Sequence, residues 1–238
     1  MTVQIPGSGD PDRRTSLLWR TPSHPDHRPG PRSSLDVDRI VTAAIGLADR
    51  DGLGAVSMRR VAAELGIGAM TLYGHVPGKG ELVDLMLDSV LTELYADGAP
   101  AGNWRARLHA VADENRMLFL RHPWAVHLAP GRPPLGPHAM RKYELELRAV
   151  DGLGLSDLEM DLLVGLVNGF ALSAVNGPPQ RAAGDRAFID AARFPTAARV
   201  GRAGADRLSV DDARKRSFDF GLERLLDGIG VLILDASR

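Results

Sequence analysis

Apolar residues recur at three- and four-residue spacing through every long segment after residue 35, and this helical period restricts the possible folds more than any other feature. Alternation at every second residue, which marks a half-buried strand, is nowhere convincing. The 238 residues, of which 44% are hydrophobic and 25% charged, are enough to bury a sizeable core. We therefore predict an all-α protein without internal repeats.

Composition excludes several kinds of protein and site. The chain has no cysteine, so disulfide scaffolds, thiolate metal sites and thiol nucleophiles are excluded. Its N-terminal end has no continuous apolar segment of the kind found in secretion signals. The longest apolar run, residues 162–175, is interrupted by Asn168 and is shorter than the ~20 residues that cross a bilayer. We expect a cytoplasmic protein with no membrane segment.

Residues 1–34 form an N-terminal arm with six of the sixteen prolines and no helical or strand period. The arm carries five Arg and three Asp. This composition predicts disorder. Two interpretations of the charge remain open: a solvated tail, or an arm that contacts DNA.

Three helical segments follow the arm. The first runs from Asp36 to a stop at Gly52, with Asp36 and Asp38 where the helix dipole favours anions. The second is "SMRRVAAELG", which ends at Gly66, and the third is "IGAMTLYGHV". Two short helices joined at a glycine and braced by longer ones predict a helix-turn-helix unit.

At this unit the chain resembles the tetracycline-repressor-like (TetR) regulators, and the likeness extends from Asp36 to about Leu87. The residues that carry it are "SMRRVAAELG", "TLYGHV" and the following Lys79. The resemblance implies an N-terminal three-helix helix-turn-helix domain, residues 35–80, that binds operator DNA. It further implies that residues 81–238 form a helical ligand-binding and dimerisation domain. The DNA-binding residues implied by the motif are Arg59, Ala69, Met70, Thr71, Tyr73, His75 and Lys79.

The residue types of the third segment suit DNA contact independently of the resemblance. Thr71, Tyr73 and His75 lie on or beside the face opposite Leu72 and Val76. Hydroxyl groups can bond phosphate or a base edge, and the Thr methyl can contact a thymine methyl. The alternative is structural, with the Tyr and His side chains covering a core.

Two features weaken the DNA interpretation. Residues 35–96 contain five basic and nine acidic side chains, a net charge of −4, so positive charge has to be placed locally. Gly74 stands where similar proteins commonly carry a bulky or basic side chain. A glycine inside a helix costs about 0.5–1 kcal/mol relative to Ala and offers no side-chain contact.

The second half of the chain contains "RHPWAVHLAPGRPP", which resembles the inducer-pocket segment of the tetracycline repressors. By that resemblance His127, Arg132 and Pro133 contact the inducer. A lone His is also a common structural residue, and no clustered carboxylates accompany it. We predict no metal and no cofactor.

Two amides and two aromatic rings complete the predicted ligand site. Asn115 and Asn168 lie on otherwise apolar helical faces, where a buried amide needs partners. Each is therefore a helix–helix hydrogen bond or a pocket contact. Phe119 and Phe170 can line an apolar cavity, although aromatic residues at this spacing also build ordinary cores. A capping box at Ser156 and Glu159 opens the helix that contains Asn168 and Phe170.

These features together predict a homodimeric, ligand-responsive transcriptional regulator, most simply a repressor released from a palindromic operator by a small-molecule inducer. A dimer is expected because one short recognition helix makes few contacts, and the helices over residues 155–175 and 214–233 have apolar surface for a four-helix seam. The sequence does not exclude an activator. The rival class is an all-α enzyme or binding protein that uses the C-terminal cavity, but no metal-ligand pair or nucleophile motif supports it. We predict that the chain is not an enzyme.

Overall fold

The computed structural model describes residues 11–20, 35–128, 135–176, 191–203 and 210–236, and all regular elements within them are helices. The prediction of an all-α protein is confirmed. The α-helices are α1 (Pro11–Leu18), α2 (Val37–Asp51), α3 (Met58–Glu64), α4 (Ala69–His75), α5 (Lys79–Val90), α6 (Trp104–Arg121), α7 (Pro137–Arg148), α8 (Asp157–Asn176), α9 (Pro195–Ala203) and α10 (Val210–Ala236). Short 3-10 helices occur at Leu53–Ala55, Leu91–Glu93 and Pro123–His127.

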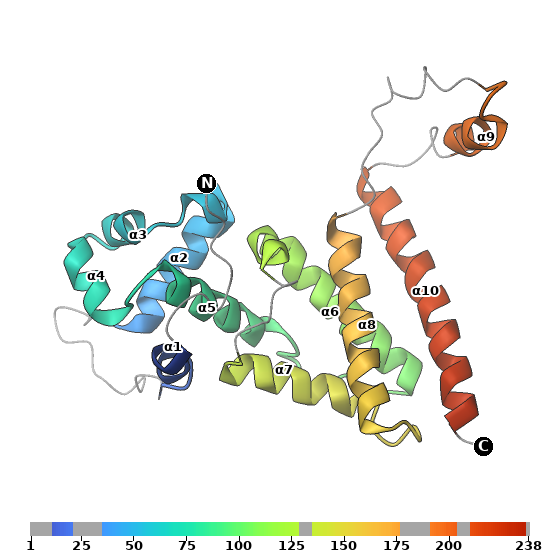
Figure 1. The fold of residues 1–238 in the computed structure, drawn as a ribbon, viewed down its shortest axis with the longest axis horizontal. Helices are drawn as coiled ribbons and strands as arrows, with labels where there is room; N and C mark the ends of the chain where they lie inside the picture. The colour runs from blue at the N-terminus through green and yellow to red at the C-terminus, as the bar shows by residue number, and fades with distance from the viewer. Residues whose placement is uncertain (1–10, 21–34, 129–134, 177–190, 204–209, 237–238) are drawn as a thin grey trace.

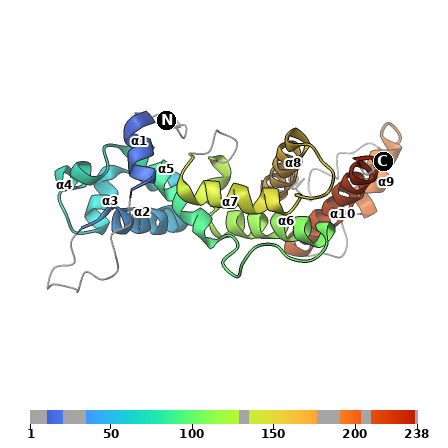
Figure 2. The same cartoon turned by 90° about the horizontal axis from the view of Figure 1, so that it is seen from below.

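The molecule is elongated, with α1 to α5 at one end and α6, α7, α8 and α10 at the other (Figure 1). Figure 2 shows the same division from below, with α5 leading from the first group toward the second. Helix α9 stands apart from both groups in Figure 1.

Helices α2 to α4 begin and end at residues whose local chemistry favours those boundaries. The Asp36 side chain caps α2 by accepting a hydrogen bond from the Arg39 N–H at 2.8 Å. Ser57 caps α3 in the same way through the Arg60 N–H at 3.3 Å. Gly66 adopts a φ of +68° in the turn between α3 and α4, a conformation that costs glycine little. The predicted helix-turn-helix is therefore present, and Leu72 of α4 is fully buried in its core.

The N-terminal arm differs from its prediction over residues 11–20. Helix α1 lies in this range, and Leu18 is buried in the common core with an exposed fraction of 5%. The prediction of disorder is wrong there because an eight-residue helix is too short to show a helical period, while two adjacent leucines are enough to dock it. Residues 1–10 and 21–34 of the predicted arm lie outside the described residues.

The C-terminal bundle is built around α6 and α8, with α7 and α10 packed against them (Figure 1). The predicted capping box at the start of α8 is confirmed. The Ser156 N–H donates to Glu159 Oε2 at 2.8 Å, and the Glu159 N–H donates to Ser156 Oγ at 3.4 Å. The Ser156 hydroxyl also donates to Glu159 Oε2 at 2.6 Å, and this bond, followed by the one from the Ser156 N–H, lowers the pKa of the Glu159 carboxyl.

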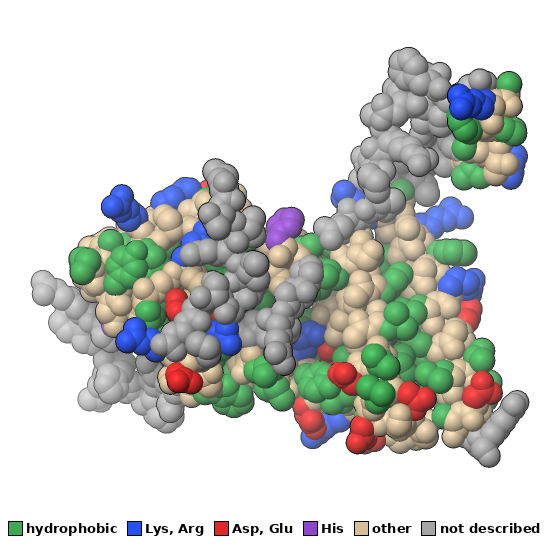
Figure 3. All heavy atoms as spheres, viewed as in Figure 1, with side chains coloured by type: hydrophobic (Ala, Val, Ile, Leu, Met, Phe, Trp, Pro, Cys, Tyr) green, Lys and Arg blue, Asp and Glu red, His purple; other side chains and the backbone are tan. Residues whose placement is uncertain are grey.

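Helices α8 and α10 expose large apolar side chains (Figure 3). By length and composition alone, Asp157–Val175 of α8 is long and apolar enough to cross a membrane, because the apolar stretch begins five residues before the run of residues 162–175 that was predicted to be too short. An apolar face of this kind needs another surface against it. The large exposed side chains on the two helices are Leu158, Leu162, Leu166, Phe220, Val231, Leu232 and Leu234.

Candidate functional site

Helix α4 presents a polar face to solvent. Leu72 and the following Val76 are fully buried, which turns the opposite side of the helix outward. Thr71 is exposed, Tyr73 has an exposed fraction of 44%, and Met70 is 82% exposed. Ala69 and His75 are half-buried. The residues predicted to contact DNA on this helix therefore lie together at its exposed side, and the Tyr73 side chain does not cover a core.

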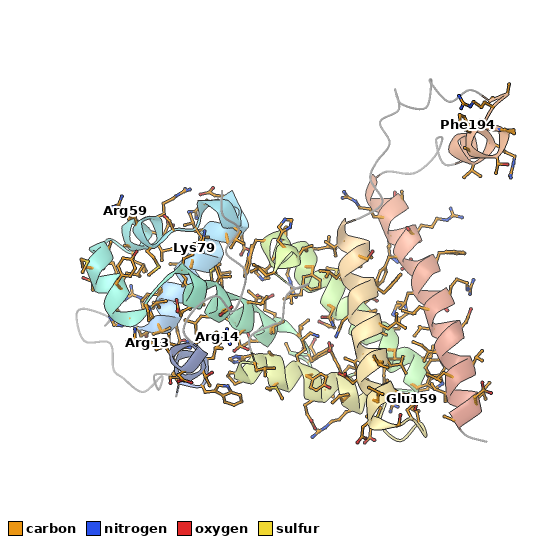
Figure 4. The ribbon with its side chains drawn as sticks, in the orientation of Figure 1. Arg13, Arg14, Arg59, Lys79, Glu159 and Phe194 are labelled. Carbon is orange, nitrogen blue, oxygen red and sulfur yellow. The ribbon has the colours of Figure 1, made fainter. Side chains whose placement is uncertain are left out.

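Two basic residues from neighbouring helices lie at the same end of the molecule. Figure 4 shows Arg59 extending from α3 and Lys79 at the start of α5. Arg59 is exposed and Lys79 half-buried, and within the described residues neither makes an ion pair. A cation beside the N-terminus of α5 adds to the free backbone N–H groups of that end, which also attract anions.

Gly74 lies on the exposed side of α4. A Cβ atom built at this position would meet no heavy atom within 4 Å, so the space beside it is open. The glycine is therefore not required by packing within the chain. Its effect on DNA recognition stays a prediction.

Several acidic residues of this end are paired or buried. Arg60 donates to Asp51 at 2.7 Å and Arg50 to Glu64 at 3.3 Å. The two arginines are already counted in the net charge of −4, so these pairs neutralise charge only locally. The carboxylates buried on α5 are Glu81, Asp84 and Asp88.

The second candidate site is a buried polar cluster where α6, α7 and α8 meet. At its centre lies Glu146 of α7, with an exposed fraction of 1%. Its carboxylate accepts hydrogen bonds from the Tyr95 hydroxyl at 2.7 Å and from Asn115 Nδ2 at 2.8 Å. Asn168 Nδ2 donates at 2.9 Å, and Lys142 Nζ lies 2.7 Å away. We call these five residues the Glu146 cluster.

The cluster brings together two residues that the sequence singled out and three that it did not. Asn115 and Asn168 were predicted as helix–helix hydrogen bonds or pocket contacts, and each donates to Glu146. Burial and the neighbouring carboxylate raise the pKa of the Tyr95 hydroxyl, which remains a hydrogen-bond donor. Asn168 Oδ1 is buried and has no hydrogen-bond partner among the described residues. A buried acceptor without a partner is uncommon in folded proteins.

The other predicted ligand residues lie in different surroundings. Phe119 is buried in the core, and Phe170 stacks on Phe218 of α10 with 5.5 Å between ring centroids. His127 is exposed at the end of its 3-10 helix. Within the described residues, none of these three forms a hydrogen bond with the Glu146 cluster. Arg132 and Pro133 lie outside the described residues.

A polar joint connects the helix-turn-helix end with the bundle. His122 follows α6, and its Nδ1 lies 2.7 Å from Asp49 Oδ1 of α2. Its Nε2 lies 2.9 Å from Glu93 Oε1. The Trp124 indole N–H donates to the same Asp49 oxygen at 2.7 Å. We call these four residues the His122 joint, which links the end of α6 to α2.

Comparisons with known proteins agree with this arrangement. Residues 40–86 match the family model described as "Bacterial regulatory proteins, tetR family", and residues 98–233 match "Tetracyclin repressor-like, C-terminal domain". The HTH-type transcriptional repressor DrrR1 of Streptomyces coeruleorubidus is 41% identical over 246 residues, which cover 98% of this chain and 90% of the relative. Tetracycline repressor protein class D of Escherichia coli is 27% identical over 83% of this chain and 90% of its own length.

Solved structures give the same result. The Streptomyces coelicolor TetR family protein ActR in complex with (S)-DNPA has a TM-score of 0.71 and 30% sequence identity, covering 86% of this chain and all of ActR. ActR in complex with actinorhodin has a TM-score of 0.71 and 29% identity, over 84% of this chain and 99% of ActR.

Proposed function

The chain belongs to the TetR family of bacterial regulatory proteins, and we propose that it represses transcription as a homodimer bound to a palindromic operator. As a member of this family it is a ligand-responsive, DNA-binding transcriptional repressor. Residues 35–80 are the proposed DNA-binding domain, and residues 81–238 the proposed ligand-binding and dimerisation domain. A cytoplasmic location and the absence of enzymatic activity stay predictions.

The exposed polar face of α4 is the observation that carries the proposal. Its Thr71 and Tyr73 side chains are exposed, one on either side of the buried Leu72. We assign this face to base edges and phosphates in the major groove, and Arg59 and Lys79 to the flanking phosphates. The assignment extends to Ala69, Met70 and His75 on the same helix.

Dimerisation is supported by the uncovered apolar face of α8 and α10. Leu162 and Leu166 of α8 are 62% and 52% exposed, and Phe220 of α10 is 67% exposed. Pairing these helices with those of a second subunit would give a four-helix seam. A two-fold dimer places its recognition helices about 34–36 Å, or a multiple of this, apart on DNA.

We place the proposed ligand site at the Glu146 cluster, between α6, α7 and α8. The unpartnered Asn168 Oδ1 supports a ligand that donates a hydrogen bond. ActR has been crystallised with (S)-DNPA and with actinorhodin, which supports a small-molecule ligand here. We propose that ligand binding displaces α6 and that the His122 joint passes the displacement to α2. Roles for Phe119, His127, Arg132, Pro133 and Phe170 stay part of the proposal.

Selection of bound duplexes from a random DNA pool tests the DNA part. A palindrome with half-sites about one helical turn or a multiple apart is the expected result. Recovery of sequences with no two-fold symmetry would contradict the dimeric mode. Light scattering on Leu162→Glu gives a separate test, because a charge in the seam should leave a monomer. A dimer of unchanged stability would remove the seam from the proposal.

Calorimetry tests the ligand part by linkage. A compound identified by its effect on thermal stability is titrated into the free protein and into the protein–operator complex. A coupling of typically 1–3 kcal/mol predicts about 5- to 150-fold weaker ligand binding when operator is present. Equal affinity in the two titrations would mean that this ligand does not control DNA binding.

A further inference from the structure

Helix α1 occupies a defined position against the DNA-binding end of the molecule. Leu18 is buried against α5, and the Trp19 indole N–H donates to the Leu135 carbonyl oxygen at 2.9 Å. Arg20 donates to the Leu17 carbonyl oxygen at 2.8 Å and forms an ion pair with Asp38 of α2. These contacts hold α1 in place against α5 and α2.

The charges of α1 complement those of the helices beneath it. Residues 11–20 carry three Arg and one Asp, whereas residues 35–96 have a net charge of −4. Arg14 Nε lies 3.9 Å from Asp84 Oδ2, and the Asp84 side chain is completely buried. With Arg20 on Asp38, two cations of the N-terminal segment offset two carboxylates of the DNA-binding helices.

Arg13 lies on another side of α1 from Arg14. In Figure 4 it projects toward the end of the molecule that carries α4, whereas Arg14 projects toward α5. Arg13 is exposed, and Figure 3 shows several Lys and Arg side chains at the surface of this end of the molecule. A cation at this end of the molecule can reach the phosphate backbone that borders a major groove occupied by α4.

We propose that α1 is part of the DNA interface and that Arg13 of each subunit contacts a backbone phosphate beside the groove entered by α4. The inference rests on the proposed function, since it needs α4 to be the recognition helix. The contact supplies affinity and register but no base readout. It adds to the phosphate contacts proposed for Arg59 and Lys79.

Arg13→Ala tests the contact through the salt dependence of binding. Affinity for the duplex recovered from the random pool is measured by fluorescence anisotropy over a sodium chloride series. Each lost phosphate contact lowers the slope of log K against log salt by about 0.9, so a dimer should lose about two. The counterion effect vanishes at 1 M salt, so wild type and variant should bind equally there. From that point the reduced slope predicts roughly 30-fold weaker binding of the variant at 0.15 M salt and about ninefold weaker binding at 0.3 M.

Two further variants separate the contact from general effects of charge and folding. Lys215→Ala removes one exposed cation of α10 and should leave both affinity and slope unchanged. Leu18→Gln keeps every arginine but undocks α1, and should reproduce the reduced slope of Arg13→Ala. Thermal melting checks that both α1 variants remain folded.

Wild-type protein that binds no duplex at all would overturn the proposed function and this inference with it. When the wild type binds, an Arg13→Ala variant with unchanged affinity or unchanged slope overturns the inference alone. Full binding by Leu18→Gln does the same, because the docked position of α1 would then be irrelevant.

Discussion

Two ion pairs on α7 have the same spacing and length and differ mainly in burial. Lys142 Nζ and Glu146 lie 2.7 Å apart, with side-chain exposed fractions of 16% and 1%. Arg148 Nε and Glu144 also lie 2.7 Å apart, with 65% and 57% exposed. Each pair spans four residues of one helix, so the second is an internal control for the first.

Lys142→Ala should destabilise the protein far more than Arg148→Ala. Removing one partner of a buried pair costs about 3–5 kcal/mol because the other charge is left uncompensated. The amide and hydroxyl groups that still donate to Glu146 partly compensate its charge, so we expect a cost at the lower end of this range, about 3 kcal/mol. Breaking the exposed pair costs less than about 1 kcal/mol. Helix propensity contributes little to the difference, since Lys and Arg are similar helix formers.

Thermal unfolding at matched protein concentration measures the difference. For a chain of this size 1 kcal/mol corresponds to roughly 2–4 °C, so Lys142→Ala should lower Tm by about 6–12 °C and Arg148→Ala by less than about 4 °C. Glu146→Gln completes a double-mutant cycle, because Lys142→Ala should lower the stability little once the carboxylate is gone. Equal Tm values for the Lys142 and Arg148 variants, or an equal cost of Lys142→Ala in the Gln background, would refute the assignment of a buried charge pair.

Three further predictions concern DNA contact and helix capping. Tyr73→Ala and Lys79→Ala should each weaken operator binding, the latter with a salt slope reduced by about 0.9 per subunit; a salt titration unchanged for both would contradict the assigned face. Gly74→Arg has open space for its side chain and should raise affinity for unrelated DNA more than for the operator, whereas loss of all binding in a folded dimer would mean that glycine is needed for close approach. Ser156→Ala should lower Tm at neutral pH. Because the pKa of Glu159 is lowered in the folded protein, its contribution is present above the ordinary value of 4.5 and is lost as the pH falls through the folded-state pKa. The Tm difference from wild type should therefore shrink in acid, and a difference independent of pH would rule out the carboxylate as its source.

The helix-turn-helix could be predicted because its boundaries depend on neighbours in sequence. Ser57 caps α3 by accepting a hydrogen bond from the N–H three residues later, and Gly66 supplies the positive φ of the turn. Both effects involve only residues that are close in the sequence. Helix α1 could not be predicted in the same way. Its stability comes from Leu18 against α5 and from an ion pair between Arg20 and Asp38, contacts that span 18 residues or more.

The Glu146 cluster shows where sequence patterns stop being informative. Glu144 and Glu146 are two positions apart on one helix, and each has a basic residue four positions away. Only the packing of α6 and α8 against α7 buries one and leaves the other in solvent. The two amides were recognisable because Asn115 and Asn168 interrupt apolar faces, whereas the carboxylate that joins them had no such signal.

The His122 joint is also made of residues far apart in the sequence, and it connects the two ends of the molecule. Its four side chains come from α2, from the 3-10 helix after α5, and from the segment that follows α6. His122 and Trp124 both lie on the bundle side and both bond to one oxygen of Asp49, so the end of α6 cannot shift without stretching these hydrogen bonds or moving α2 with it. Since α2 packs against α5 and α3, a movement passed through Asp49 reaches the helices that position α4. Coupling between a ligand in the bundle and DNA at α4 therefore needs no contact between the two sites, only a joint that is rigid enough to transmit a small displacement.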